Sequence, residues 1–269
     1  MHDQELHEPK LKALLKALRR MESAVLAYSG GVDSSFLLKA LSMAGIPAMA
    51  VTARSAATPQ ADLADALRLA AELGVAHRVI DSRETEDENF LRNHPDRCFH
   101  CKNELFGTLC RLAGEEGYAV VLDGSTLEDA QDYRPGREAA RRHGVRSPLL
   151  ECGFRKAEIR AASRALGLDT WQKPASPCLS SRFPYGRRIT PEALRRVEKA
   201  EEFLRTRGLR ELRVRDHGET ARIEVPAGDM EKLLSLREEV VHHLTGLGYS
   251  FVALDLGGFR SGNLNRTLR

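Results

Sequence analysis

The chain has 269 residues, of which 42% are hydrophobic and 29% are charged, as is typical of a folded protein with a sizeable core. Its formal net charge is only +3, which excludes a general attraction to nucleic acid, so any basic function must be local. No apolar stretch approaches the ~20 residues that span a bilayer. The N-terminus indicates a charged helix over residues 9–20 rather than a signal peptide. The sequence predicts a cytoplasmic protein of one large or two ordinary domains.

Apolar runs alternate with helical patterns through the first two thirds of the chain. Such alternation predicts an α/β fold with a mainly parallel, doubly wound sheet. The expected strands cover residues 24–28, 46–53, 76–81 and 119–123, and the expected helices cover 34–44, 59–73 and 156–166.

The pattern changes after residue 171, where the stretch WQKPASPCLSSRFPYGR carries three prolines, three serines and a glycine. Such composition is typical of a linker. Beyond it, a helix over residues 190–207 starts at Thr190-Pro191, a good helix start. Two strands, a helix and a last strand follow, over 211–215, 221–225, 229–245 and 250–254, which predicts a smaller α+β domain. We therefore expect a first domain over residues 1–175, a cysteine-bearing linker over 176–188 and a second domain over 189–269.

The segment AYSGGVDSSFLLKAL, residues 27–41, places two glycines between the first strand and the first helix. Glycines let backbone N–H groups approach a polyanion, and the helix that follows adds the positive end of its dipole. Serine hydroxyls add donors, and the aspartate of this loop can help to hold Mg²⁺. The Gly-Lys-Ser/Thr of a Walker A loop is absent, and a glycine–serine turn without a ligand is the alternative. The candidate phosphate-binding residues are Ser29, Gly30, Gly31, Asp33, Ser34 and Ser35.

Five cysteines form an odd set, which argues against a disulfide framework in a reducing compartment. Cys98 and Cys101 form a C-x-x-C pair, which can chelate one metal but is only half of a zinc site, and a buried or redox pair is the alternative. Cys110 lies on an apolar helical stripe and Cys152 follows two leucines, so both are assigned to packing.

Cys178 lies in SPCLSSRFPYG, a segment rich in hydroxyls. If Cys178 is exposed beside Arg182, its thiolate becomes a nucleophile. Together with Cys98 and Cys101 it makes three thiolates, which leave one iron of a cubane cluster open to an exogenous sulfide.

Seven segments occur in a characteristic order: SGGVDSSFL, RCFHCKNELF, DGSTLEDAQDYRPGREAA, RSPLL, PCLSSRFPYG, RVRDHGETARIEV and LDLGGFRSGNLN. They resemble the LarE family of PP-loop ATP pyrophosphatases, which are ATP-dependent sulfur insertases. These enzymes build the nickel-pincer nucleotide cofactor of lactate racemase. The resemblance runs over residues 20–266. The first loop is shared by the whole PP-loop (adenine nucleotide α-hydrolase-like) superfamily, whereas the pair of PCLSSRFPYG and RVRDHGETARIEV is more specific.

The resemblance implies a reaction. ATP binds with its pyrophosphate on Ser29–Ser35, and a carboxylate of pyridinium-3,5-biscarboxylic acid mononucleotide attacks the α-phosphorus. A sulfur nucleophile then displaces AMP and leaves a thiocarboxylate, so that one hard substitution becomes two easier ones. In one version of the family the cysteine matched by Cys178 gives up its own sulfur. In another version three cysteines, here Cys98, Cys101 and Cys178, bind a [4Fe–4S] cluster that carries sulfide; the three cysteines favour this version, and the first stays open.

The resemblance also implies that the segment after the fourth strand lines the nucleotide site, although a helix cap and a surface loop are the alternative. Its residues are Asp123, Gly124, Ser125, Thr126, Asp129, Asp132 and Arg134. The resemblance alone implies that Arg260, Ser261 and Gly262, which follow the last strand, also contribute to the site.

Arg213 and Arg215 alternate on a predicted strand, so both project from one face. Paired guanidiniums suit a phosphate or a carboxylate, both of which this substrate carries. Arg182, Glu201 and Glu224 are further candidates for this substrate site, with a solvated surface position as the alternative for each glutamate.

Three rival functions remain. Residues 182–215 hold 11 Lys/Arg against 5 Asp/Glu, which would suit a tRNA thiolase, although interleaved glutamates favour a solvated helix face. An ATP-dependent amidotransferase or ligase would use ammonia and would not need Cys178. A nucleotide sensor would bind ATP without cleaving it. We expect a nucleotide-like small-molecule substrate, no nucleic-acid partner, and a homo-oligomer.

Overall fold

The computed structural model describes residues 2–131, 135–174, 176–260 and 262–268. The chain divides into two compact units. Unit 1 comprises Met1–Glu84 and Asp96–Ser176, and unit 2 comprises Thr85–Pro95 and Pro177–Arg269. The segment over residues 85–95, which the sequence analysis placed within the first domain, thus groups with unit 2. Of the helices in these described ranges, none is both long and apolar enough to cross a membrane.

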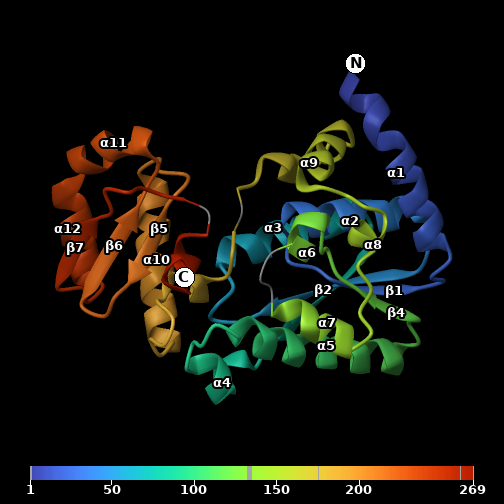
Figure 1. The fold of residues 1–269 in the computed structure, drawn as a ribbon, viewed down its shortest axis with the longest axis horizontal. Helices are drawn as coiled ribbons and strands as arrows, with labels where there is room; N and C mark the ends of the chain where they lie inside the picture. The colour runs from blue at the N-terminus through green and yellow to red at the C-terminus, as the bar shows by residue number, and fades with distance from the viewer. Residues whose placement is uncertain (1, 132–134, 175, 261, 269) are drawn as a thin grey trace. The chain divides into compact units, whose positions relative to one another are not determined.

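Unit 1 is built on a four-stranded parallel sheet (Figure 1). Its strands lie in the order β3-β2-β1-β4, and Leu26 of β1 pairs with Ala50 on one side and Leu122 on the other. The predicted α/β class is therefore confirmed. The strands are β1 (Ala24–Ala27), β2 (Ala48–Arg54), β3 (Ala76–Asp81) and β4 (Val120–Leu122).

Helices cover both faces of this sheet (Figure 1). Successive side chains of a strand point to opposite faces, so Leu26 packs into one core with α1, α2 and α9, while Val25 packs into the other with α5 and α7. This double cover is why the central strand β1 and its neighbour β4 read as continuous apolar runs. The helices are α1 (His2–Arg19), α2 (Val32–Ala44), α3 (Gln60–Glu72), α5 (Arg97–Glu116), α6 (Leu127–Gln131), α7 (Gly136–Arg142), α8 (Pro148–Glu151) and α9 (Lys156–Ala165).

The order of the strands defines where a ligand would bind. From β1 the chain continues to β2 and β3 on one side, then returns to β4 on the other side of β1. Ligands of open α/β sheets bind at the carboxyl ends of the strands where the order reverses in this way. The loop after β1 and the segment after β4 lie at that point.

Unit 2 has a three-stranded sheet of order β5-β6-β7, in which β5 and β6 are antiparallel and β6 and β7 are parallel. Helices α10 and α12 contribute Leu204 and Leu244 to its core, beside Val214 and Ile223 of the sheet. The elements are α4 (Glu88–Leu91), α10 (Pro191–Thr206), β5 (Arg213–Asp216), β6 (Thr220–Glu224), α11 (Met230–Ser235), α12 (Arg237–Gly246) and β7 (Phe251–Leu254).

Two details differ from the sequence-based expectation. The helix expected over residues 229–245 is divided at Leu236, whose ψ of 6° departs from the helical value. The stretch expected to be an irregular linker contains two 3₁₀ turns, Asp169–Gln172 and Leu179–Arg182.

Candidate functional site

The loop after β1, residues 29–35, is the candidate phosphate-binding loop, called the phosphate loop below, and its backbone geometry suits an anion. Gly30 adopts a φ of +69°, and a Cβ there would lie 3.0 Å from the Cβ of Ala66 and from the carbonyl oxygen of Asp62, so only glycine fits. Gly31 is the N-cap residue of α2, and no described side chain caps this helix end. The first N–H groups of α2 therefore have no partner within the helix and remain available to an anion.

The loop hydroxyls support the loop and contribute one exposed group. The Oγ atoms of Ser29 and Ser34 lie 3.1 Å apart, and Ser34 Oγ donates to the carbonyl oxygen of Gly31 at 3.2 Å. Ser35 is fully buried, with its Oγ 3.3 Å from the Tyr28 hydroxyl. Ser29, which is exposed, is the hydroxyl best placed for a ligand.

The segment after β4 lies against the start of α2. A Cβ on Gly124 would lie 3.1 Å from the backbone nitrogen of Ser34, so the two segments form one surface. Asp123 accepts hydrogen bonds from the N–H of Ser125 (3.1 Å), the Oγ of Ser125 (2.8 Å) and the Oγ of Ser147 (2.7 Å). The structure thus brings Asp123, Gly124 and Ser125 to the phosphate loop.

Asp129 is held away from the solvent as a local cap. Its carboxylate accepts from the backbone and the hydroxyl of Thr126, both at 3.0 Å, and lies 2.9 Å from the Nζ atom of Lys156. This geometry matches the helix-cap alternative, although it does not test a role in the site. Asp132, Arg134 and Ser261 lie outside the described residues.

Asp33 is the titratable group of the loop. Burial is the main cause that raises its pKa to about 6, and the carboxylates of Asp129 and Glu128 add to the shift. The cations Lys156 and Arg160 oppose it only in part. A divalent cation would relieve this penalty because it favours the ionised carboxylate, so the donor set fits Mg²⁺.

The sequence analysis missed Lys173, which lies beside the phosphate loop. Its Nζ atom contacts the carboxylates of Asp62 (2.8 Å) and Asp65 (2.9 Å) and the carbonyl oxygen of Gly30 (3.4 Å). Burial alone would lower its pKa, but the two carboxylates raise it overall, so the amine stays charged. The only sequence signal was one lysine in a stretch rich in proline and serine.

The five cysteines fall into two groups, those that pack against a core and those that are at least partly exposed. No disulfide joins the five, all of which lie within the described residues. Cys98 is exposed and Cys101 is half-buried, and their i, i+3 spacing places them on one face of the first turn of α5. Cys110 and Cys152 pack against the two cores of unit 1. Cys178, in unit 2, is exposed.

This donor set fits a thiolate-bound cluster only in part. Two thiols on one helical turn suit such a site, but the described residues contain no group of three or more His, Cys, Asp or Glu side chains arranged to hold a metal.

In unit 2 a buried cluster of ion pairs occupies the predicted substrate-binding positions. Arg182 forms a bidentate pair with Glu201, both N–O distances being 2.8 Å, and Arg215 pairs with Glu224 at 2.8 Å. Both glutamates are fully buried, so the alternative of a solvated surface position is wrong for them. The pattern of the sequence did not show that each glutamate has an arginine partner.

Arg213 and Arg215 both lie on β5 and are 8% and 6% exposed. Burial, reinforced by the neighbouring charge of Arg182, lowers the pKa of Arg213 to about 10. Such a destabilised cation would gain from an anionic ligand. The guanidinium of Arg213 also stacks over the ring of Phe259, at 5.0 Å from its centroid.

Most arginines of the basic segment 182–215 have a carboxylate partner. These ion pairs offset part of the local excess of positive charge. The pairs are Arg182–Glu201, Arg187–Asp216, Arg188–Glu88, Arg195–Glu192, Arg196–Asp216, Arg205–Glu201, Arg207–Glu239 and Arg215–Glu224.

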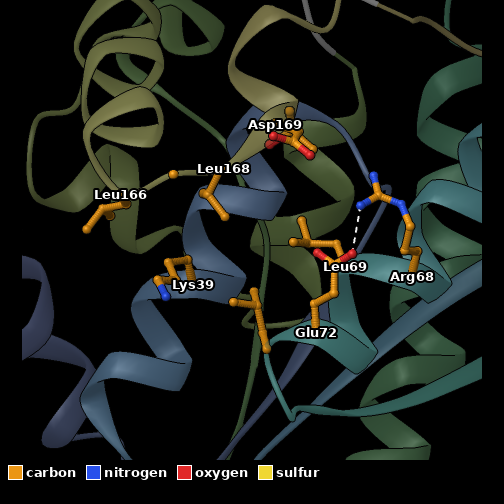
Figure 2. Close-up of a pocket in the computed structure, with 10 residues that line it drawn as sticks. Lys39, Arg68, Leu69, Glu72, Leu166, Leu168 and Asp169 are labelled. Atoms are coloured by element: carbon orange, nitrogen blue, oxygen red, sulfur yellow. Dashed lines mark hydrogen bonds and ion pairs between the residues drawn. The ribbon is translucent and has the colours of Figure 1, made fainter.

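A cavity of about 100 Å³ lies elsewhere in unit 1, between α2, α3 and the segment over residues 166–170 (Figure 2). Its wall combines Leu69 and Leu168 with the charged Lys39 and with the Arg68–Glu72 ion pair. Asp169 also lines the cavity, so two positive and two negative side chains surround it, and none of the predicted site residues lines it.

Comparisons with known proteins identify the family. No family model matches the chain. It is 43% identical to an uncharacterized protein of Synechocystis sp. over 97% of this chain and 98% of that one. It is 39% identical to the pyridinium-3,5-bisthiocarboxylic acid mononucleotide synthase of Lactiplantibacillus plantarum, over 96% of this chain and 95% of the relative. A tRNA-specific 2-thiouridylase MnmA, from Xanthobacter autotrophicus, is 30% identical over 63% of this chain and 54% of its own length.

The similarity to the synthase extends over nearly the whole of both chains, whereas the similarity to the thiouridylase covers only part of each chain. The predicted resemblance is thus confirmed, and with it the α/β PP-loop fold. The chain belongs to the LarE family, the pyridinium-3,5-bisthiocarboxylic acid mononucleotide synthases of the PP-loop superfamily.

Proposed function

We propose that this protein is an ATP-dependent sulfur insertase. It adenylates a carboxylate of pyridinium-3,5-biscarboxylic acid mononucleotide and converts it to a thiocarboxylate, for the nickel-pincer nucleotide cofactor of lactate racemase. The observation that carries the proposal is the full-length relationship to a synthase of the bisthiocarboxylic acid mononucleotide. The uncapped start of α2 beside Gly30 and Gly124 supports it, because this surface suits a nucleotide phosphate chain.

The first step is assigned to unit 1. The N–H groups at the start of α2 and the Ser29 hydroxyl hold the phosphates of ATP, and Asp33 holds Mg²⁺ beside them. A substrate carboxylate then attacks the α-phosphorus, pyrophosphate leaves, and an acyl-adenylate forms. Lys173 keeps a positive charge next to the loop. Adenylation turns a poor leaving group, oxide, into a good one, AMP.

The second step is assigned to Cys178, whose exposed position supports a role as sulfur donor or ligand. A sulfur nucleophile attacks the acyl carbon and AMP leaves. Cys98, Cys101 and Cys178 would hold a [4Fe–4S] cluster, which supplies sulfide when bound. The alternative donor is the Cys178 sulfur itself: its thioester with the substrate would lose the Cα proton and break at the Cβ–S bond, which releases the thiocarboxylate and leaves dehydroalanine.

The test is a single-turnover reaction of anaerobically purified protein with Mg-ATP and the dicarboxylic mononucleotide. We expect pyrophosphate, AMP and a thiocarboxylate in equal amounts. Iron and sulfide analysis, with intact mass before and after turnover, then identifies the sulfur source. Unchanged mass with bound iron indicates a cluster, and the loss of one H₂S indicates that Cys178 was consumed. Amide formation with ammonia, or ATP binding without cleavage, would contradict the proposal.

A tRNA thiolase is the second candidate, because a partial match to MnmA favours it. The carboxylate partners of the basic segment argue against it. We therefore expect no gel shift with tRNA at physiological salt, since backbone binding requires unneutralised cations. We further propose that the protein is cytoplasmic and forms a homo-oligomer. Sedimentation velocity tests the oligomeric state.

A further inference from the structure

The peptide groups on both sides of Cys178 share one hydrogen-bond donor. The Nη1 atom of Arg182 donates to the carbonyl oxygen of Pro177 at 2.6 Å and to that of Cys178 at 3.1 Å. The N–H of Ser181 donates to the same Cys178 carbonyl at 3.0 Å. Because a peptide group is planar, fixing the planes before and after a residue fixes both of its backbone dihedrals. The bonds to both carbonyl oxygens therefore restrain φ and ψ of Cys178, while its side chain can still rotate about χ1.

The donor is itself held rigidly. Arg182 is 1% exposed, and Glu201 receives its Nε and Nη2 atoms in a bidentate pair. Glu201 is fully buried on α10 and also accepts the N–H of Val214 at 3.1 Å. The guanidinium therefore cannot turn without breaking charge-assisted hydrogen bonds in a dry environment.

A second arginine supports the same turn. Arg215 of β5 donates to the carbonyl oxygen of Ser181 at 2.7 Å and pairs with Glu224 at 2.8 Å. The turn is thus bonded to two regular elements of unit 2, α10 and β5, while the residue at its start, Cys178, is exposed. Two buried ion pairs are costly in free energy, and the contacts they make are to the backbone of the cysteine-bearing turn.

We infer that Arg182 is a positioning residue for Cys178: held by Glu201, its guanidinium fixes the peptide groups around Cys178 and so the direction of the thiol. Arg182 and Glu201 were predicted as substrate-binding residues; in the structure Arg182 bonds Glu201 and this turn, and Glu201 also accepts from Arg205 and the N–H of Val214. The placement of the thiol is inferred from these contacts alone. Its use in sulfur transfer rests on the proposed function.

The test compares three variants of the full chain. Arg182→Lys keeps the charge but loses the planar fork. Arg182→Met/Glu201→Leu removes both charges, so no buried charge is orphaned if the single variant fails to fold. Arg205→Gln is the matched control, because Arg205 pairs with the same glutamate at 2.7 Å, and its only described bond is to that glutamate.

Two measurements are made on each variant. The first is hydrogen exchange of the Ser181 amide, which needs no substrate. The second is the amount of thiocarboxylate formed per pyrophosphate released, with thermal unfolding as a check on folding. We expect the two Arg182 variants to exchange this amide at least about tenfold faster, and to form at least about tenfold less thiocarboxylate per pyrophosphate, as loss of charged hydrogen bonds implies. Arg205→Gln should match the wild type.

A merely structural role would lower both products together and leave their ratio unchanged, and this result would overturn the inference. Equal exchange in Arg182→Lys and Arg205→Gln would also overturn it. If the wild type forms no thiocarboxylate, the proposed function fails, and the exchange result alone decides whether Arg182 positions Cys178.

Discussion

Asp33 of the phosphate loop is a half-buried acid whose charge the neighbouring cations compensate only in part. Asp33 sits among Asp129, Glu128, Lys156 and Arg160, and burial dominates, so its pKa rises to about 6 from an ordinary 3.8. Between these two values the unfolded chain loses the proton while the folded chain keeps it. Folding is therefore not penalised below the unfolded pKa, where the side chain is a neutral acid in both states, and the folded state loses stability as the pH rises through 6 and the group ionises.

Asp33→Asn should therefore raise the free energy of unfolding at pH 7–8, by at most about 3 kcal/mol given the size of the shift. The gain should shrink as the pH falls through 6 and vanish below about pH 3, where Asp33 is protonated in both states. Urea unfolding from about pH 3 to 8 measures it. A gain in stability that does not depend on pH would show that Asp33 ionises normally. In the same variant we expect loss of Mg²⁺-dependent pyrophosphate release.

Lys173 supplies the opposite charge. Lys173→Met would leave the carboxylates of Asp62 and Asp65 uncompensated beside the carbonyl of Gly30, so repulsion should weaken binding of a non-hydrolysable Mg-ATP analogue by about tenfold. Calorimetry measures the affinity. Lys39→Met, which alters the separate cavity of Figure 2, is the control and should bind normally. Equal affinities of all three proteins would exclude Lys173 from the site.

The residues that sequence could and could not identify differ in the range of their contacts. The strand–loop–helix arrangement around Ser29–Ser35 could be predicted because strand, glycines and helix are consecutive in the chain. Lys173 was missed because its partner Asp62 lies more than 100 positions away. The burial and pairing of Arg182 and Glu201 were not predicted, because this ion pair depends on a contact between a loop and a helix.

At the scale of elements, local signals predicted well where a cap or a turn decides the boundary. Helix α10 begins as expected, with the Thr190 hydroxyl accepting the N–H of Ala193 at 3.2 Å and Pro191 at the first helical position. The division of the helix expected over residues 229–245 was not predicted, because the break at Leu236 carries neither proline nor glycine.

Thr190→Ala should lower the free energy of unfolding by about 1 kcal/mol, because it removes this cap. Thr190→Ser keeps the hydroxyl and should restore most of the loss. Guanidinium unfolding of the wild type and both variants measures the difference. If serine and alanine destabilise equally, the methyl group rather than the hydrogen bond accounts for the stability at this position.

At the scale of the whole molecule, the alternation of strands and helices was enough to predict the parallel sheet, since crossover connections leave few alternatives. It also placed the phosphate loop at the strand end where the sheet order reverses. The grouping of residues 85–95 with unit 2 was not predictable. It depends on bonds such as that from the N–H of Ile189 to the carbonyl of Leu91 at 2.8 Å, which join segments about 100 positions apart.

We propose that the phosphate loop binds the ATP that activates the substrate carboxylate and that Cys178 is required for sulfur delivery. The most direct measurement is the single-turnover yield of pyrophosphate and of thiocarboxylate in Cys178→Ser. Our account predicts that pyrophosphate release persists, because the loop is intact, while thiocarboxylate falls to background. Undiminished thiocarboxylate in this variant would contradict the account.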